Sequence, residues 1–179
     1  MIEIIEGNLL ESNCSIICHQ VNCKGVMGSG IAKQIRDKWP EAFSSYCNFL
    51  EYNYMNGICR YSYDFLGRCF LAQCNEKGTS NFQFIANFFS QDAYLPRTVC
   101  HTDYGAFREC CKQLKLQIEE VLLVSYEYKF KKELLTIGFP YKIGCGLAGG
   151  DWNTVYSIIE EEFKDYNVRI YKYNETKNN

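Results

Sequence analysis

The spacing of apolar and polar residues predicts strands that are separated by helices. Residues 1–6 alternate as a half-buried strand does, and residues 16–18 form an apolar run typical of a buried strand. Ile31, Ile35 and Trp39 recur at a spacing of four, which indicates a helix. We expect strands at residues 1–6, 15–22, 68–74, 82–89, 134–139 and 168–173. We expect helices at residues 30–38, 41–52, 104–118 or further, and 151–164.

Several connections between these elements carry their own prediction. Pro40 ends the first helix because proline lacks an N–H donor and restricts the residue before it. Thr102 and Asp103 are expected to cap the long helix that begins near Tyr104. Residues 119–132 are apolar at first and basic later, and we expect the helix to continue into them with a break. The strands at 68–74 and 82–89 are close in sequence, so we expect an antiparallel pair. Residues 53–67, between the second helix and this pair, are expected to be irregular.

Alternating strands and helices predict an α/β fold with three layers, α/β/α, around a mixed central sheet. A chain of 179 residues that is 47% apolar can form one well-packed domain and is short for two. We therefore expect a single domain over residues 1–174. The polar residues 175–179 are expected to form a disordered tail.

Charge and hydropathy exclude some partners. A net charge of −2 argues against a strongly basic nucleic-acid surface. No apolar run approaches the roughly 20 residues that cross a bilayer, and the strand-like start has no basic region before it. We expect a cytoplasmic protein without a signal peptide or a membrane contact.

The chain has eleven cysteines, an odd number, and none of them form a Cys-x-x-Cys pair. Zinc sites usually show that close pairing, so neither a metal cluster nor a complete set of disulfides is indicated. We expect free thiols, with Cys18, Cys69 and Cys110 acting as small apolar residues in the core. No metal and no cofactor are expected.

Two glycine-rich loops each follow a predicted strand and precede a predicted helix. The first holds Gly25, Gly28 and Gly30, and the second runs from Gly144 to Gly150. Glycine lets backbone N–H groups approach a ligand, and a helix start favours an anion. If the two strands are parallel neighbours, both loops leave the same sheet edge, which suits a diphosphate. The alternative is that the glycines serve the geometry of tight turns alone.

The residues of both loops resemble a known family, the macrodomains. The stretch from His19 to Ala32 resembles the first ligand loop of that family, and residues 143–152 resemble the second. Gly7, Asn8 and Leu9 stand where many members have Gly-Asp-Ile. The order and spacing of the three pieces agree over residues 2–173. The resemblance is to the branch with terminal ADP-ribose glycohydrolases, DNA-ADP-ribose-removing antitoxins and yeast-type ADP-ribose 1''-phosphate phosphatases.

This resemblance implies ADP-ribose, or a macromolecule that carries it, as the partner. Asn8 would lie near the adenine amine, loop residues including Asn22 would hold the distal ribose, and the second loop would wrap the diphosphate. Lys24 would project into solvent beside the loop or contact a phosphate. The implied ligand-binding residues are Asn8, Leu9, Gln20, Asn22, Gly25, Val26, Met27, Gly28, Ser29, Gly30, Ile31, Ala32, Gly144, Cys145, Gly146, Leu147, Ala148, Gly149 and Gly150.

The chain departs from the branch at two positions. Glycohydrolases and antitoxins use a lysine on the strand that corresponds to residues 87–91, where this chain has Ser90 and Gln91. The glycohydrolases also place an aspartate where this chain has Ala148. Both departures argue against a mechanism through a lysine adduct.

Four residues are candidates for catalysis: Asn22, Asp151, Asp92 and His19. Asn22 would orient the ribose or a water, and Asp151 or Asp92 would act as the base. Asp151 matches the antitoxin loop, and the alternative for it is a helix N-cap. Asp92 lies where the acidic partner of the phosphatase histidine would be, and it could instead be a solvated turn residue. His19 matches that phosphatase histidine, and it could instead be packed within the sheet.

Three functions remain open on the sequence. The chain could hydrolyse an ADP-ribosyl linkage or ADP-ribose 1''-phosphate, with water activated by a carboxylate or by a ligand phosphate. It could bind ADP-ribose without turnover, as a reader module. A general nucleotide or nucleic-acid binder is the third, and it predicts steep salt dependence. Direct nucleic-acid binding is not expected, apart from an ADP-ribosylated substrate.

Overall fold

Six strands form one mixed sheet in the computed structural model, which describes residues 1–75, 82–96, 98–124 and 135–173. Strand β3 runs antiparallel to β4, and every other neighbouring pair is parallel. The predicted antiparallel pair and the mixed sheet are therefore confirmed. In spatial order the strands are β1 (Ile2–Glu6), β6 (Asn167–Lys172), β5 (Thr136–Pro140), β2 (Ile16–Asn22), β4 (Phe82–Gln91) and β3 (Cys69–Asn75).

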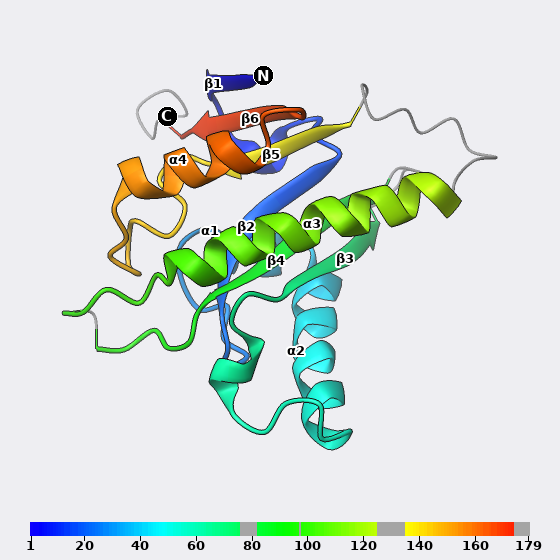
Figure 1. Ribbon diagram of the computed structural model, residues 1–179, viewed down its shortest axis with the longest axis vertical. Helices are drawn as coiled ribbons and strands as arrows, with labels where there is room; N and C mark the ends of the chain where they lie inside the picture. Colours follow the sequence, from blue (N-terminus) through cyan, green and yellow to red (C-terminus); the bar gives the residue numbers. More distant parts are fainter. Residues whose placement is uncertain (76–81, 97, 125–134, 174–179) are drawn as a thin grey trace.

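Helices cover both faces of this sheet, which gives the predicted three layers. Figure 1 shows α3 and α4 on the near face and α1 and α2 behind the sheet. The helices are α1 (Gly30–Lys38), α2 (Pro40–Met55), α3 (Tyr104–Val124) and α4 (Trp152–Glu162), with short 3₁₀ turns η1 (Leu9–Glu11) and η2 (Ser62–Phe65).

Strand β2 lies inside the sheet and contributes to the cores on both of its faces. Ile16 and Cys18 pack with α3 and α4, whereas Ile17 packs with α1 and Val21 with α2. Side chains alternate between the faces of a strand, so a strand covered on both sides is apolar almost throughout. The polar residues of β2 are His19, whose side chain is fully buried in the middle of the strand, and Gln20 and Asn22 near its end.

The helix boundaries follow local chemistry. Pro40 is the first residue of α2, where its missing N–H costs no hydrogen bond. Helix α4 begins at Trp152 because the Asp151 side chain caps it, accepting from the Thr154 N–H at 2.8 Å. Helix α3 continues to Val124 as predicted, and the rest of residues 119–132 lies outside the described residues, as does the predicted tail 175–179.

Of the two residues that were expected to cap α3, Asp103 does so and Thr102 does not. Asp103 caps α3 as expected, since its Oδ1 accepts from the Ala106 N–H at 2.8 Å. Thr102 has a different role, because its hydroxyl donates to the Gly144 carbonyl at 2.6 Å. The Gly144 carbonyl lies 42 residues away in the chain, so the sequence around Thr102 does not indicate that its hydroxyl binds there instead of capping the helix.

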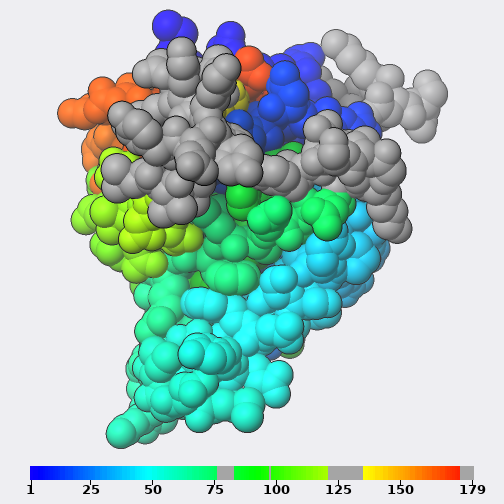
Figure 2. All heavy atoms as spheres, turned by 90° about the vertical axis from the view of Figure 1, so that its right-hand side faces the viewer, coloured from blue at the N-terminus to red at the C-terminus, as the bar shows by residue number. Residues whose placement is uncertain are grey.

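Residues 53–67, which were predicted to be irregular, include the end of α2 and the turn η2. Figure 2 shows this part of the chain, in cyan and teal, projecting from the rest of the molecule. None of the helices in the described residues is both long and apolar enough to cross a membrane.

Candidate functional site

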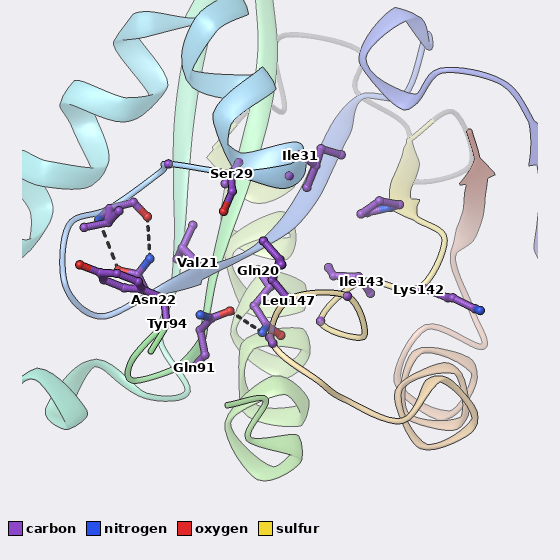
Figure 3. Close-up of a pocket in the computed structure, with 18 of the residues that line it drawn as sticks. Gln20, Val21, Asn22, Ser29, Ile31, Gln91, Tyr94, Lys142, Ile143 and Leu147 are labelled. Atoms are coloured by element: carbon purple, nitrogen blue, oxygen red, sulfur yellow. Dashed lines mark hydrogen bonds between the residues drawn. The ribbon is translucent and has the colours of Figure 1, made fainter. Parts of the chain in front are cut away.

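The sheet register brings the two glycine-rich loops together. Strands β2 and β5 are parallel neighbours, with Ile16 opposite Ile137 and Ile17 opposite Gly138. Loop 1 (residues 23–29) and loop 2 (residues 141–151) therefore leave the same edge of the sheet. Between them lies a cavity of about 520 Å³, which falls in the size range of small-molecule sites (Figure 3).

The cavity is lined by the ends of three strands, both loops and the start of α1. Figure 3 shows Asn22, Gln91 and Tyr94 toward one end, and Ile143 and Lys142 toward the other. The lining residues are Gln20, Val21, Asn22, Val26, Gly28, Ser29, Gly30, Ile31, Ala32, Gln91, Tyr94, Leu95, Pro140, Tyr141, Lys142, Ile143, Gly144, Gly146, Leu147 and Ala148.

Asn22 holds loop 1 in shape. Its Nδ2 donates to the Val26 carbonyl at 2.6 Å, and its Oδ1 accepts from the N–H groups of Lys24 at 2.9 Å and Val26 at 3.3 Å. The Tyr46 hydroxyl also donates to the Asn22 carbonyl at 2.6 Å. An amide with one acceptor oxygen and one NH₂ group is largely occupied by these bonds. Asn22 thus contributes to the site by fixing the backbone conformation of loop 1.

The start of α1 offers donors to the cavity. The first N–H groups of a helix have no partner within it, and the Ser29 side chain, at the N-cap, makes no capping hydrogen bond. Ser29, Gly30, Ile31 and Ala32 all line the cavity. An anion at this place would be stabilised by N–H groups and by the helix dipole together.

Loop 2 offers a second set of donors. Within the loop, Gly149 N–H donates to the Gly146 carbonyl at 3.0 Å and Gly150 N–H to the Gly144 carbonyl at 2.9 Å. These bonds close a turn whose remaining N–H groups, those of residues 146–148, make no hydrogen bond within the described part of the chain. Residues 146–148 line the cavity opposite α1, so a diphosphate between the two would meet donors on both sides.

Few charges are present in the cavity. Lys142 is the one residue with a formal charge among the described residues that line it, and its ammonium lies 5.6 Å from the centre of the Tyr141 ring. Among residues 1–75, 82–96, 98–124 and 135–173, no group of three or more His, Cys, Asp or Glu is placed to hold a metal ion. Recognition of an anion here rests mainly on backbone N–H groups.

The structure does not bring His19 to the cavity. Its ring is fully buried, and Nε2 lies 2.8 Å from the Asn87 Oδ1 on the neighbouring strand β4. Burial lowers the pKa of His19 to about 4, although the Asn87 hydrogen bond acts in the opposite direction. A neutral histidine inside the sheet is the alternative that the sequence left open, and it removes His19 as a phosphate partner.

Neither of the two candidate carboxylates is among the residues that line the cavity. Asp92 is paired with Lys24, with 3.3 Å between Oδ1 and Nζ. Asp151 accepts from the Thr154 N–H and hydroxyl, both at 2.8 Å, and these bonds lower the pKa of its carboxyl. A carboxylate held in this way is a weaker base than a free one.

Most of the predicted ligand-binding residues line the cavity, and the others shape the surrounding structure. Leu9 is buried against β5, where a Cβ at Gly138 would lie 2.6 Å from its Cδ1. Asn8 caps η1 by accepting from the Leu10 N–H at 3.0 Å. Met27 belongs to the core under α2. The predicted residues outside the lining are Asn8, Leu9, Gly25, Met27, Cys145, Gly149 and Gly150.

Sequence reasoning missed eight lining residues. Gln91 is opposite Asn22 in the register of β4 with β2, so its position at a strand end was the available indication. Tyr94 and Leu95 follow on the same connection, and residues 140–143 end β5 and begin loop 2. The missed residues are Val21, Gln91, Tyr94, Leu95, Pro140, Tyr141, Lys142 and Ile143.

Comparisons with known proteins agree with this geometry. A family model described as Macro domain matches residues 18–159. The ADP-ribose 1''-phosphate phosphatase of Saccharomyces cerevisiae is 23% identical over 182 residues, which cover 96% of this chain and 98% of the yeast protein. The macrodomain of Mycobacterium tuberculosis DarG superposes with a TM-score of 0.71 at 23% identity, covering 96% of this chain and 97% of that one. Thermosipho africanus DarTG in complex with ADP-ribose gives a TM-score of 0.66 at 17% identity, covering 96% of this chain and 41% of that one.

Proposed function

The chain belongs to the macrodomain family, and we propose that it binds ADP-ribose, or a derivative of it, in the cavity between loop 1 and loop 2. The observation that carries the proposal is the pair of facing donor sets. The uncapped start of α1 lies on one side, and the N–H groups of residues 146–148 lie on the other. Two phosphates joined by one oxygen fit between two such sets.

The character of the two cavity ends supports one orientation of the ligand. Pro140, Tyr141 and Ile143 give one end, where Lys142 also lies, an apolar and aromatic surface that suits the adenine ring. Asn22 and Gln91 make the other end polar, which suits the hydroxyl groups of the distal ribose. The atom C1'' and any group attached to it would then lie near Tyr94 and the mouth of the cavity.

The proposal is tested by Gly146→Val and Gly28→Val. A Cβ at Gly146 meets no protein atom within 4 Å, and one at Gly28 meets only Val26 at an ordinary 3.5 Å. Neither glycine has a positive φ, so both variants should fold. Their branched side chains would fill the space of the diphosphate, and we expect at least about tenfold weaker binding of ADP-ribose in calorimetry. Unchanged affinity in both folded variants would show that the ligand lies elsewhere.

We extend the proposal to hydrolysis of an ADP-ribose derivative. The 23% identical yeast relative carries the name ADP-ribose 1''-phosphate phosphatase and matches over nearly its whole length. Hydrolysis at the distal ribose needs a positioned water and stabilisation of developing charge. The donor sets of α1 and loop 2 would stabilise charge on the phosphates. Because both candidate carboxylates make other contacts, a ligand phosphate is the base that this geometry favours.

The second candidate is a reader that binds ADP-ribose without cleaving it. The specific observation in its favour is that no carboxylate and no histidine lie among the described lining residues. An assay with ADP-ribose 1''-phosphate, ADP-ribosylated protein and ADP-ribosylated DNA separates the two, with Gly146→Val as the blank. Release of phosphate or ADP-ribose above the blank supports the hydrolase. Binding without release supports the reader.

Two further variants test the role of a carboxylate in any such release. Asp151→Asn and Asp92→Asn keep the side-chain shapes without a base. If turnover survives in both variants, a carboxylate base is excluded and the ligand phosphate remains.

We also propose that the protein works in the cytoplasm. All eleven cysteines are free, and eight of them are buried. Free thiols in this number persist where glutathione and thioredoxin keep them reduced.

A further inference from the structure

A series of hydrogen bonds ties loop 2 to the sheet through Thr102, the residue before the α3 cap. The Thr102 side chain is buried, with 6% of the residue exposed. Its hydroxyl donates to the Gly144 carbonyl at 2.6 Å and accepts from the Gln20 Nε2 at 3.1 Å. The Gln20 Oε1 accepts in turn from the Ser90 hydroxyl at 2.9 Å. Strands β2 and β4 thereby fix where the start of loop 2 lies.

Backbone hydrogen bonds fix the other end of the same turn. The N–H groups of His101 and Thr102 both donate to the Ala148 carbonyl, at 2.8 and 3.3 Å. The Asp103 N–H donates to the Ser90 carbonyl at 2.8 Å. Residues 101–103 therefore bridge the end of β4 and both ends of the turn from Gly144 to Ala148.

Two glycines of loop 2 are required by this bridge. A Cβ at Gly144, where φ is +71°, would lie 2.5 Å from the Gln20 Oε1 and 3.0 Å from the Thr102 hydroxyl. A Cβ at Gly150 would lie 2.8 Å from the Gly144 carbonyl oxygen. Gly146 has open space around it instead. Gly144 and Gly150 thus leave room for the bridge, whereas Gly146 lines the cavity without such a contact.

We propose that Thr102 is a positioning residue that holds the N–H groups of residues 146–148 in place for the ligand phosphates. The inference rests on the proposed binding of ADP-ribose and adds to it a residue that is outside the cavity lining. A turn fixed at both ends before binding loses little conformational freedom when the phosphates arrive. If the hydrogen bond to Gly144 is lost, the turn is less ordered before binding. The ligand must then order it, and the free-energy cost of that ordering lowers the affinity.

The test is Thr102→Val, which keeps the branched shape and removes the hydroxyl. Thr102→Ser keeps the hydroxyl, and Thr154→Val removes a hydroxyl hydrogen bond at the exposed start of α4 as the matched control. Affinities are measured by calorimetry for ADP-ribose and by NMR titration for adenosine, which has no phosphate. We expect Thr102→Val to bind ADP-ribose about tenfold more weakly, the effect of losing one buried hydrogen bond. Adenosine affinity should not change, and Thr102→Ser and Thr154→Val should bind as the wild type does.

The outcomes separate the inference from the proposed function. A wild-type chain that binds no ADP-ribose contradicts both. A wild type that binds it, with Thr102→Val binding equally well, contradicts the role of Thr102 alone. Equal losses for ADP-ribose and adenosine would show a general structural role and would also overturn it. Should Thr102→Val not fold, Thr102→Ala removes the same hydroxyl with a smaller side chain and is judged by the same outcomes.

Discussion

At the scale of single residues, His19 shows how burial decides chemistry. The residue stands at the place in the sequence where a histidine could act on a phosphate. Its ring instead lies within hydrogen-bond distance of the Asn87 side chain on the neighbouring strand β4, without exposure to solvent. The same side chain that would titrate near neutral pH in water is held neutral, so its effect is on stability.

This burial predicts a pH dependence of folding. The pKa of His19 is about 4 in the folded chain and 6.5 when unperturbed, so the unfolded state takes up a proton first as the pH falls. The contribution to stability is fully present above pH 6.5 and is lost between pH 6.5 and about 4. The loss is about 3 kcal/mol in the free energy of unfolding.

Urea unfolding of the wild type and of His19→Gln at several pH values measures the contribution of His19 to the free energy of unfolding. The glutamine amide can donate to Asn87 and does not titrate, so the difference between the two proteins should shrink or change sign across that range. Carboxylates act alike in both proteins and cancel. A His19 ring that titrates near 6.5 in the folded protein by NMR would contradict the account.

At the scale of elements, helix α1 carries a conflict between stability and binding. Its N-cap Ser29 makes no capping hydrogen bond, although serine is a residue that usually does. An uncapped start leaves donors for a ligand and leaves the free helix less stable. The sequence from Gly28 to Ala32 therefore serves the cavity more than it serves the helix.

Ser29→Asp should reverse this balance. A carboxylate at the N-cap can accept from the first-turn N–H groups and interacts well with the helix dipole, so we expect about 0.5–1 kcal/mol of added stability. The same carboxylate would repel the ligand phosphates and lower ADP-ribose affinity by about tenfold. Ser29→Asn is the neutral control, which can cap without repulsion. Denaturant melts and calorimetry on the three proteins measure both effects, and unchanged affinity in Ser29→Asp would place the phosphates away from α1.

At the scale of the whole molecule, the three layers determine which thiols are reactive. Cys18, Cys69 and Cys110 are buried in the core beneath α3 and α4, as the sequence predicted. Burial raises the pKa of Cys145 to about 11, so little thiolate forms there at neutral pH. Cys100, by contrast, is exposed on the connection that leads to α3.

We therefore expect a maleimide to modify Cys100 first in the native protein. Peptide mass spectrometry over time should find one fast site, and Cys100→Ser should remove the fast phase. Unfolding in urea should open the eight buried thiols to the reagent. Fast modification of several core cysteines in the native protein would contradict the packing described here.

Local sequence patterns predicted the elements and the edge of the sheet at which the cavity lies. Apolar periodicity predicted all six strands and four helices of the described residues, and the glycines of both loops predicted where a ligand would meet the backbone. These features are local, because they depend on side-chain spacing and on conformations open to few residues. Which side chains meet was decided only by the tertiary structure. His19 is neutral because helices cover its face of the sheet, and Thr102 holds Gly144 because β2, β4 and loop 2 converge there. Such contacts join segments far apart in the chain, and no local pattern records them.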